Sequence, residues 1–381
     1  MFRRPSIIVL VLVVAASLAL AACAPAPAPT EAPTAMPAPT EAPTTAAPAA
    51  PAATAVPPTA VPPPPPVCDP LPNAMTPAAG SLGSADKPLV ITFVPSVDVG
   101  KITLGGQQMA DCISKMTGLT YKIEVGTSEF ASVEAMGGGK AQMGFLNTFP
   151  ILLAYEKYKI EPALIAQRKY GIRQADGTYT AFDFDPDKGL AGQLTSFYKP
   201  EFFTRADTGI KTLADAKGHT FCFTSAGSTS GGIIPRAMFA AMGIDPDKDL
   251  KSTYAGGHDK AAIAVYNGDC DAGDAFMDIR TDAATNLQGK YPDITDKVVV
   301  FAVGQRIPND GLQFVANLDP AIKSITVDAL MAMMADKGGA AVVSSIYGYN
   351  AFEKATFADN YAAFEKLLKD GGIDPAKLVK Q

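Results

Sequence analysis

Short apolar runs alternate with longer amphipathic stretches along the chain beyond residue 87. Short runs rich in Val, Ile, Phe and Tyr are typical of buried strands, whereas apolar positions repeated every three or four residues are typical of helices. Strands are therefore predicted at residues 88–94, 119–125, 142–146, 219–224, 250–254, 270–276 and 297–303. Helices are predicted at 101–116, 131–136, 149–157, 232–242 and 260–267, with a largely helical stretch over 325–380.

This order of elements predicts an α/β fold with two lobes. The strand–helix–strand–helix–strand pattern occurs twice, before and after a looser stretch at 170–207. Such alternation predicts parallel-rich sheets flanked by helices, with right-handed crossovers. Residues 87–203 are predicted to begin the first lobe, 204–305 to form the second, and 306–381 to cross back and complete the first. Ligands of such sheets bind beyond the carboxyl ends of the strands, so the predicted site is a cleft between the lobes.

Residues 1–22 have the pattern of an export signal. Two arginines precede an apolar run at 7–22. A helix of that length spans about 24 Å, shorter than the roughly 30 Å hydrocarbon core of a membrane, so a secretory signal peptide is favoured over a membrane span. The run ends in Leu-Ala-Ala-Cys at 20–23, which resembles the lipobox of bacterial lipoproteins. The resemblance implies cleavage before Cys23 and lipid on its thiol; the alternative is an ordinary secretory signal that contains a cysteine.

Residues 23–66 are predicted to form the Cys anchor and a disordered, extended tether. Between residues 24 and 66 the chain has 16 Pro, 15 Ala and 7 Thr, which is half of its 32 prolines. Proline favours polyproline II structure, which cannot bury a core. At about 3.1 Å per residue the tether would reach on the order of 130 Å. A lead-in segment at 67–86 then connects it to the first lobe.

Composition and charge exclude several classes of protein. With 32 Lys+Arg, 38 Asp+Glu and a formal net charge of −6, the chain has no basic stripe, so nucleic acid is not an expected partner. Two His and five Cys are too few for zinc clusters or iron–sulfur centres, and no metal or cofactor is expected. Asp183, Asp185 and Asp187 are spaced like calcium ligands, but Lys188 replaces the glycine that a calcium-binding loop requires. They are interpreted as a solvated acidic loop.

A glycine-rich turn at 227–232 has the composition of an anion-binding site. It follows a predicted strand and opens a predicted helix, so backbone N–H groups and the hydroxyls of Ser228, Thr229 and Ser230 converge at a positive helix end. One alternative is a plain Ser/Thr helix cap. Another is a nucleophilic serine activated by His258, although Thr229 stands at the centre, where a nucleophile elbow needs serine.

Two further turns point to the same cleft. Residues 256–259 place His258 at another predicted helix start, where its ring could donate to the same anion; otherwise it is a surface or capping residue. Residues 305–311 lie where the chain is expected to cross back to the first lobe, and their plainer interpretation is a polar turn between strands.

The turns occur in an order that resembles a known family. The ordered set is STSG at 228–231, GHD at 257–259, NGDCDAG at 267–273 and IPND at 307–310, with LVITFVPS at 89–96 and EAMGGGKAQMGFL at 134–146. This set resembles the phosphate/phosphite/phosphonate-binding proteins of ABC transporters, over essentially the whole chain after residue 87. The resemblance implies a type II periplasmic-binding-protein fold that closes around an oxyanion and delivers it to a membrane permease.

The resemblance also implies roles for single residues. The hydroxyls of Ser228, Thr229 and Ser230 would hold the phosphoryl oxygens. His258 would donate a hydrogen bond, and Asp310 would close from the hinge side. Two unit negative charges about 4 Å apart repel by roughly 4 kcal/mol at an effective dielectric constant of 20. A carboxylate facing an oxyanion is therefore tolerable only with a proton between them, which favours phosphate, phosphite or a phosphonate over sulfate.

The chain departs from the family pattern at two places. Phe130 stands where members commonly have Tyr; it can pack on an organic substituent but donates no hydrogen bond. The loop after the third strand lacks a second aromatic residue, and Asn147 or Thr148 is expected to replace it as a donor. A different small oxyanion or polar metabolite therefore stays an alternative ligand.

Four cysteines remain besides Cys23, in an exported setting where disulfides form. They allow three pairings. Cys222 and Cys270 lie on the first and third predicted strands of the second lobe, which are neighbours in a 2-1-3 strand order. That pair is expected, with Cys68 and Cys112 as the second pair; buried free thiols are the alternative.

The predicted function is that of a lipid-anchored solute receptor without catalysis. The protein is expected to act as a monomer outside the cytoplasm, held by its lipid to the outer face of the cell membrane, or in the periplasm where an outer membrane exists. It would deliver a phosphonate, phosphite or phosphate to the permease and ATPase of an ABC importer. A secreted phosphoester hydrolase using Ser228 or Ser230 with His258 is the enzymatic alternative, and a ligand-binding sensor or adhesin is the other alternative.

Overall fold

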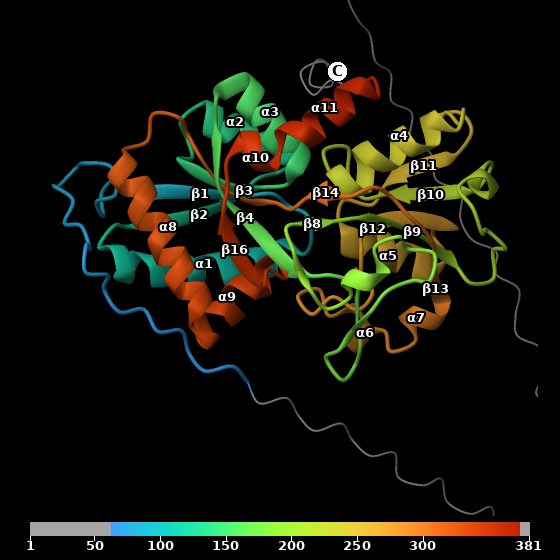
Figure 1. Cartoon of the computed structure of the whole chain (residues 1–381), viewed down its shortest axis with the longest axis horizontal. Helices are drawn as coiled ribbons and strands as arrows, with labels where there is room; N and C mark the ends of the chain where they lie inside the picture. Colours follow the sequence, from blue (N-terminus) through green and yellow to red (C-terminus); the bar gives the residue numbers. More distant parts are fainter. Residues whose placement is uncertain (1–61, 374–381) are drawn as a thin grey trace, which may run out of the picture. The chain divides into compact units, whose positions relative to one another are not determined.

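The computed structural model describes residues 62–373, which carry two β-sheets with helices on their faces (Figure 1). The predicted signal peptide, Cys23 and most of the predicted tether lie outside the described residues, as does 374–381. Within the described part, no single helix is long and apolar enough to cross a membrane. Only α8 (Pro320–Ala335) taken together with α9 (Lys337–Tyr347) passes that test, and the two are bent by 104°.

Seven strands form the sheet of the first lobe, in the order β16-β4-β15-β3-β1-β2, with β7 paired to β4. Their bounds are β1 Leu89–Phe93, β2 Tyr121–Val125, β3 Met143–Leu146, β4 Glu161–Lys169, β7 Leu194–Thr195, β15 Gly311–Phe314 and β16 Ala351–Lys354. β1 is parallel to β2 and β3, which confirms the first strand–helix–strand unit. β15 enters the sheet from the second crossing and is therefore antiparallel to β3 and β4.

Five strands form the sheet of the second lobe, in the order β11-β10-β12-β9-β13. Their bounds are β9 Pro200–Arg205, β10 Thr220–Phe223, β11 Lys251–Tyr254, β12 Ala272–Phe276 and β13 Val298–Val303. β10 is parallel to β11 and β12, in the predicted 2-1-3 order, whereas β9 is antiparallel to β12 and β13. In both lobes, parallel pairing is thus confined to three strands. The predicted lobe boundary between residues 203 and 204 falls inside β9, so the first crossing lies before Pro200.

The two crossing segments pair with each other between the sheets. β8 (Phe197–Tyr198) and β14 (Ile307–Pro308) form an antiparallel two-stranded ribbon. We call this pair the hinge ribbon; Figure 1 shows both strands between the two sheets. A second small pair, β5 (Ile172–Arg173) with β6 (Tyr179–Thr180), lies within the stretch predicted to be loose.

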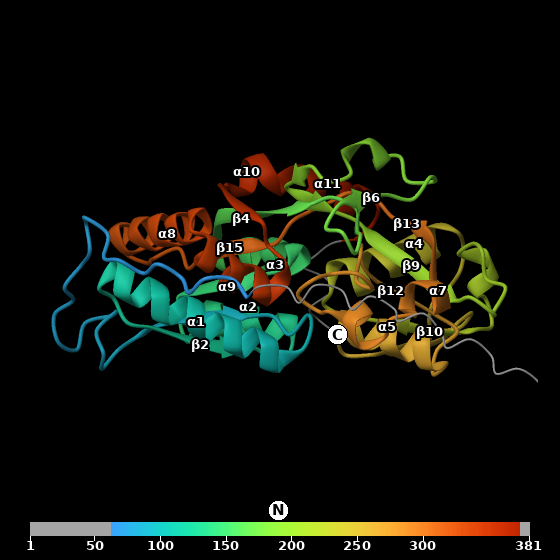
Figure 2. The same cartoon turned by 90° about the horizontal axis from the view of Figure 1, so that it is seen from below.

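Helices cover both faces of the first sheet. The α-helices of the first lobe are α1 Val99–Thr117, α2 Glu129–Gly137, α3 Thr148–Tyr158, α8, α9, α10 Phe357–Asn360 and α11 Ala362–Asp370. Those of the second lobe are α4 Ile234–Ala241, α5 His258–Asn267, α6 Leu287–Lys290 and α7 Ile294–Lys297. α1, α8 and α9 pack against one another on one face, and α2 and α3 cover the other (Figures 1 and 2). Coverage on both sides explains why all five residues of β1 are buried and why all of them except Thr92 are apolar.

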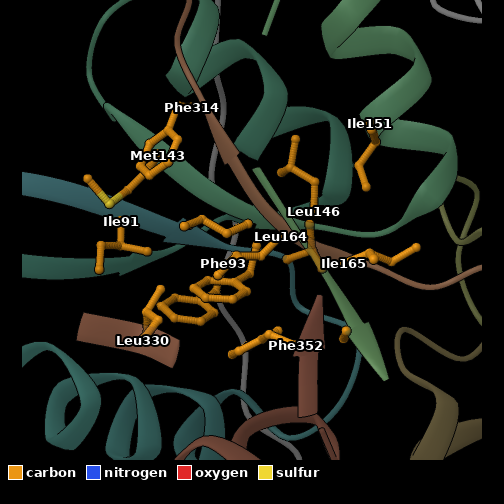
Figure 3. Packing of buried hydrophobic residues seen from close by; sticks show 14 of the residues in the cluster. Ile91, Phe93, Met143, Leu146, Ile151, Leu164, Ile165, Phe314, Leu330 and Phe352 are labelled. Carbon is orange, nitrogen blue, oxygen red and sulfur yellow. The ribbon is translucent and has the colours of Figure 1, made fainter. Parts of the chain in front are cut away.

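The hydrophobic core of the first lobe is continuous across these layers. Phe93 of β1 stacks on Phe145 of β3 with ring centroids 5.1 Å apart. Figure 3 shows Phe93, Leu164 and Phe352 directed into the same interior, so strands that join the sheet early and late in the chain share one core. In the second lobe the two sheet faces carry separate clusters, one around Phe203 and one around Phe202.

Two of the three aspartates in the acidic loop at 183–187 are not solvated as the sequence predicts. Asp183 is exposed, whereas Asp185 is buried and Asp187 is half-buried. Lys199, which is 2% exposed and directly precedes β9, places its Nζ 2.6 Å from Oδ1 of Asp185 and 2.6 Å from Oδ2 of Asp187. Arg306, next to β14, also pairs with Asp187 and lowers the pKa of that carboxyl. The two carboxylates are therefore partners of cations on both crossing segments, a role that spacing along the chain does not reveal.

Two disulfides join the pairs expected from the sequence. Cys68 bonds to Cys112 of α1, and Cys222 of β10 bonds to Cys270, which precedes the neighbouring strand β12. The first bond fixes the lead-in segment to the first lobe, where Leu71 N–H also donates to the carbonyl of Met116 at 2.8 Å.

Removal of the second disulfide should destabilise the protein measurably. The bond spans 48 residues, and the loop-entropy relation gives about 4 kcal/mol for a loop of that length. We expect the paired substitution Cys222→Ser with Cys270→Ser to lower the free energy of unfolding by that order, measured by denaturant unfolding. Wild-type protein treated with reductant is the control, because it lacks both disulfides whereas the paired variant lacks only the second. An unchanged unfolding midpoint in the paired variant would contradict the prediction.

Candidate functional site

A cavity of about 30 Å³ lies between the two lobes, at the place predicted for the site. Its lining residues follow the carboxyl ends of strands: Ser96 follows β1, Asn147 follows β3, and Phe276 ends β12. Tyr198 of the hinge ribbon closes one side. The site is thus assembled where the strands of both sheets end, as expected for α/β folds.

The Ser-Thr-Ser turn lies after β10 and leads into α4, but its three hydroxyls have different surroundings. Ser228 caps the turn, because its Oγ accepts the backbone N–H three residues further on at 3.0 Å. Thr229 Oγ1 accepts the N–H of Phe149 in the first lobe at 2.8 Å. Only Ser230, which is buried, lines the cavity. The structure therefore brings one of the three predicted hydroxyls to the cavity and uses the other two to shape the turn and join the lobes.

His258 begins α5 and lines the cavity with both ring nitrogens already engaged. Its Nδ1 accepts the N–H of Phe276 at 3.1 Å, so this hydrogen-bond network assigns the proton of the neutral ring to Nε2. That nitrogen lies 3.1 Å from Ser228 Oγ and donates to it. Burial, with a smaller contribution from Arg168, lowers the pKa of His258 from about 6.5 to about 3. The imidazole is therefore neutral at physiological pH and holds the Ser-Thr-Ser turn in place, rather than presenting a free donor to a ligand.

Asp310 lies just after the hinge ribbon and lines the cavity, as predicted. Tyr349 donates its hydroxyl to Asp310 Oδ2. Arg168, the penultimate residue of β4, lies with Nη2 3.7 Å from Asp310 Oδ1. The carboxylate therefore faces the cavity beside a cation, and no sequence motif indicates this pairing.

Asn147 and Thr148 stand where β3 passes into α3, close to the opposite lobe. Asn147 Nδ2 is 3.4 Å from the carbonyl of Gly227, and its Oδ1 is buried without a hydrogen-bond partner among the described residues. Thr148 donates its hydroxyl to the carbonyl of Pro308 in the hinge ribbon at 2.6 Å. Of the two expected donors, Asn147 alone lines the cavity.

Phe130 is not a cavity residue, contrary to the sequence-based expectation. It lies in the first turn of α2 and packs against the core of the first lobe. The neighbouring Glu129 reaches the second lobe instead and accepts the hydroxyl of Ser225 at 2.5 Å. Burial raises the pKa of Glu129. Helical geometry explains the difference, because adjacent helical residues point about 100° apart and only one of them can face the cleft.

The lobes are hydrogen-bonded to each other around the cavity. The backbone N–H of His258 donates to the carbonyl of Ser96 at 3.0 Å. Lys101 of α1 donates its Nζ to the carbonyls of Ala284 and Thr285 at 2.6 and 3.0 Å. These bonds cross from one lobe to the other, so the two lobes are in direct contact in this structure.

Sequence reasoning missed Arg168 and Tyr198. Burial raises the pKa of Tyr198 to about 12, so its hydroxyl stays protonated and can donate. Arg168 is the penultimate residue of β4 and Tyr198 ends β8, and the neighbours of both strands come from distant parts of the chain. Neither residue belongs to a recognisable motif. The one available signal for Arg168 was a basic residue at the end of an apolar run. Within residues 62–373, no group of three or more His, Cys, Asp or Glu side chains is placed to hold a metal ion.

Two lobes, each with an α/β sheet, joined by a hinge ribbon beside a cavity at the strand ends, have the architecture of a periplasmic binding protein. Residues 91–361 match the family described as "ABC transporter, phosphonate, periplasmic substrate-binding protein", and the chain belongs to this family. The family is a transporter component that binds substrate.

Similar proteins agree with this assignment. The phosphate-import protein PhnD of Mycolicibacterium smegmatis is 28% identical over 198 residues, which cover 49% of this chain and 54% of that protein, so the match spans about half of its length. A binding-protein component of an ABC phosphonate transporter from Pseudomonas aeruginosa has a similar fold, with TM-score 0.58 and 18% identity over 77% of this chain and 96% of that one. PhnD1 of Prochlorococcus marinus, solved in complex with methylphosphonate, has TM-score 0.59 and 16% identity over 74% and 97% of the two chains.

The buried neutral state of His258 predicts a specific pH dependence of stability. The folded pKa of about 3 lies below the ordinary value of 6.5, so acid protonates this histidine in the unfolded state first. Its contribution to stability is complete above pH 6.5 and is lost as the pH falls towards 3. At pH 5 the loss is about 2 kcal/mol. We expect His258→Gln to remove that much of the wild-type change in unfolding free energy between pH 7 and pH 5.

The control is His219→Gln, which removes the other histidine, a partly exposed residue beside Asp271. The comparison is between variants, because buried carboxyls with raised pKa values, such as Asp274, change stability in the opposite direction over the same range. Equal pH slopes for the wild type and His258→Gln in denaturant titrations would show that the histidine is not buried in the neutral form.

Proposed function

We propose that the protein is an extracytoplasmic receptor that binds a phosphate-like oxyanion between its lobes and delivers it to the permease and ATPase of an ABC importer. The observation that carries the proposal is the cavity between the lobes, lined by Ser230, Tyr198 and Asn147. Family membership supports the transport role, and the methylphosphonate in the Prochlorococcus protein supports the class of ligand.

The cavity has the donors that an oxyanion needs. Ser230 supplies a hydroxyl at the start of the turn that leads into α4, and Tyr198 supplies a second from the hinge ribbon. A buried hydroxyl or N–H costs free energy unless it is paired, so an anion with several acceptor oxygens would compensate these groups. His258 acts one step away, because it fixes Ser228 and through it the turn that carries Ser230.

Closure of the lobes would couple binding to delivery. The hinge ribbon is the part of the chain that passes between the sheets, so it is the place where a hinge motion would occur. A ligand that contacts both lobes binds the closed arrangement better than the open one and so shifts the population towards it. The permease would then recognise the closed form.

A phosphoester hydrolase based on Ser228 and His258 is disfavoured by the same geometry. The two side chains lie 3.1 Å apart, as in a serine–histidine pair. A general base, however, needs a free lone pair on the nitrogen that faces the serine. Here Nδ1 accepts the N–H of Phe276, so Nε2 already carries the proton. The low pKa of His258 further weakens it as a base.

Removal of the Ser230 hydroxyl should weaken anion binding. Hydrogen bonds to charged groups contribute about 1.5–3 kcal/mol, so we expect Ser230→Ala to lower affinity about tenfold or more. Calorimetry with phosphate, phosphite, methylphosphonate, aminoethylphosphonate and sulfate would measure the change and identify the preferred anion. Ser345→Ala, at an exposed position of α9, is the matched control and should bind as the wild type does. Absence of binding to every anion in the panel would refute the proposed ligand class.

Lipid attachment at Cys23 is a separate part of the proposal. The Leu-Ala-Ala-Cys run at 20–23 and the tether that follows it support an anchor at the outer face of the membrane. We expect that Cys23→Ala, expressed in a bacterial host, does not incorporate labelled fatty acid. The variant protein should also be absent from the membrane fraction. Cys68→Ala, which changes a cysteine outside the signal, should keep the label. Equal labelling of the Cys23→Ala variant and the wild type would exclude this anchor.

A further inference from the structure

Arg168 occupies an unusual position between the lobes. Its guanidinium carbon lies 5.3 Å from the ring centroid of Phe276 in the second lobe and 5.3 Å from that of Tyr349 in the first lobe. The side chain is only 19% exposed. Because the two rings come from different lobes, the guanidinium is enclosed in this way only when the lobes are together.

The guanidinium has no hydrogen-bond acceptor in the described part of the chain. Its nearest carboxylate oxygen, Asp310 Oδ1, is 3.7 Å from Nη2, which is within ion-pair distance but too long for a hydrogen bond. Its Nε is buried without a hydrogen-bond partner among residues 62–373. Arginine carries five N–H donors, and buried donors in folded proteins are almost always paired. An acceptor from outside the chain would complete this site.

The direction in which that acceptor must lie follows from the cavities. Arg168 lines the inner cavity together with Ser230. It also lines an adjoining chamber of about 70 Å³, and Phe276 and Asp282 border both spaces. Arg168 therefore forms part of the wall that the two spaces share, and a group in the inner cavity can reach it and Ser230 together.

The charges around the cavity define the chemical class of that group. Among the described residues, three charged side chains line it, namely Arg168, Asp310 and Asp282, and the ring of His258 is neutral. Without the arginine, two carboxylates would face the ligand, and an anion would be repelled. The arginine adds a planar array of N–H donors to the wall of the cavity. Such an array pairs best with a ligand that has at least two free acceptor oxygens, as phosphoryl and carboxylate groups have.

We infer that Arg168 is a specificity-determining ligand contact that donates from the first lobe to the oxyanion held by Ser230 of the second lobe. The inference rests on the proposed function and sharpens it. An anion with two or more free oxygens is selected, and a neutral polar metabolite is rejected because it would leave the guanidinium unpaired. Asp310 then has two roles, as a partner of the arginine and as an acceptor for an acidic proton of the ligand.

The test compares Arg168→Met and Arg168→Lys by calorimetry with methylphosphonate and phosphate. Truncation of one member of a buried charged pair usually costs a large part of the affinity, so we expect Arg168→Met to bind at least about 30-fold more weakly. Arg168→Lys keeps the charge but loses the planar array of donors, and we expect a loss of about fivefold or more. Arg236→Met is the matched control, since Arg236 also pairs with a carboxylate and lies 5.3 Å from an aromatic ring, but away from the cavity. Its affinity should stay within about twofold of the wild type.

The variant Asp310→Asn separates a ligand contact from a structural role. We expect it to weaken methylphosphonate binding, because the acceptor for the acidic proton of the ligand is lost. We expect it to raise the affinity for sulfate, because the arginine then faces the anion without a competing carboxylate. In the Arg168→Met background the same change should recover part of the lost affinity, because it removes the uncompensated carboxylate. A purely structural arginine predicts additive losses instead.

Each outcome decides the inference. Arg168→Met that melts at the wild-type temperature and binds within threefold of the wild type overturns it, as do additive losses in the double variant. If Arg168→Met does not fold, Arg168→Lys decides: weaker binding at an unchanged melting temperature supports the inference, and unchanged binding overturns it. A wild-type protein that binds none of the anions refutes the proposed function and the inference together. If the wild type binds and the Arg168 variants bind equally well, only the inference about Arg168 is refuted.

Discussion

Every polar group that the two lobes bury between them needs a hydrogen-bond partner, and this requirement organises the site. The N–H of Phe276 at the end of β12 is satisfied by Nδ1 of His258, which leaves the proton on Nε2 for Ser228. Ser228 in turn caps the turn that directs Ser230 into the cavity. A chain of hydrogen bonds thus connects a backbone group of the second sheet to the proposed ligand contact. The histidine supports the site from behind.

The same requirement governs the hinge, where the buried group is a cation. Lys199 lies in the first crossing and is compensated by Asp185 and Asp187. Asp187 also pairs with Arg306, which lies beside the second crossing. A buried lysine without a counter-charge would be costly, so one loop supplies the carboxylates for both segments. That loop thereby ties together the two strands about which the lobes would move.

Much of the fold and part of the site could be predicted from the chain itself, and the errors are informative. Local periodicity predicts the strand–helix–strand units of both lobes, and the parallel pairs of the structure confirm them. The 2-1-3 order of the second lobe and the Cys222–Cys270 pair that follows from it are also confirmed. The antiparallel return strands depend on where the crossings enter each sheet, which local pattern does not encode. The family resemblance predicts that Phe130 contacts the ligand, but the helix turns it towards the core and directs Glu129 to the other lobe.

The sequence by itself determined the fold class, the order of the turns that meet at the cavity, and the presence of His258 and Asp310 there, because contiguous residues carry each of these features. Only the tertiary structure decided which hydroxyl of 228–230 faces the cavity and that Arg168 does so as well. The side chain of Arg168 is enclosed by rings from both lobes, and its neighbours lie more than a hundred residues away along the chain. Such a contact exists only after the two sheets have been brought together, since no local pattern specifies which strand ends will meet.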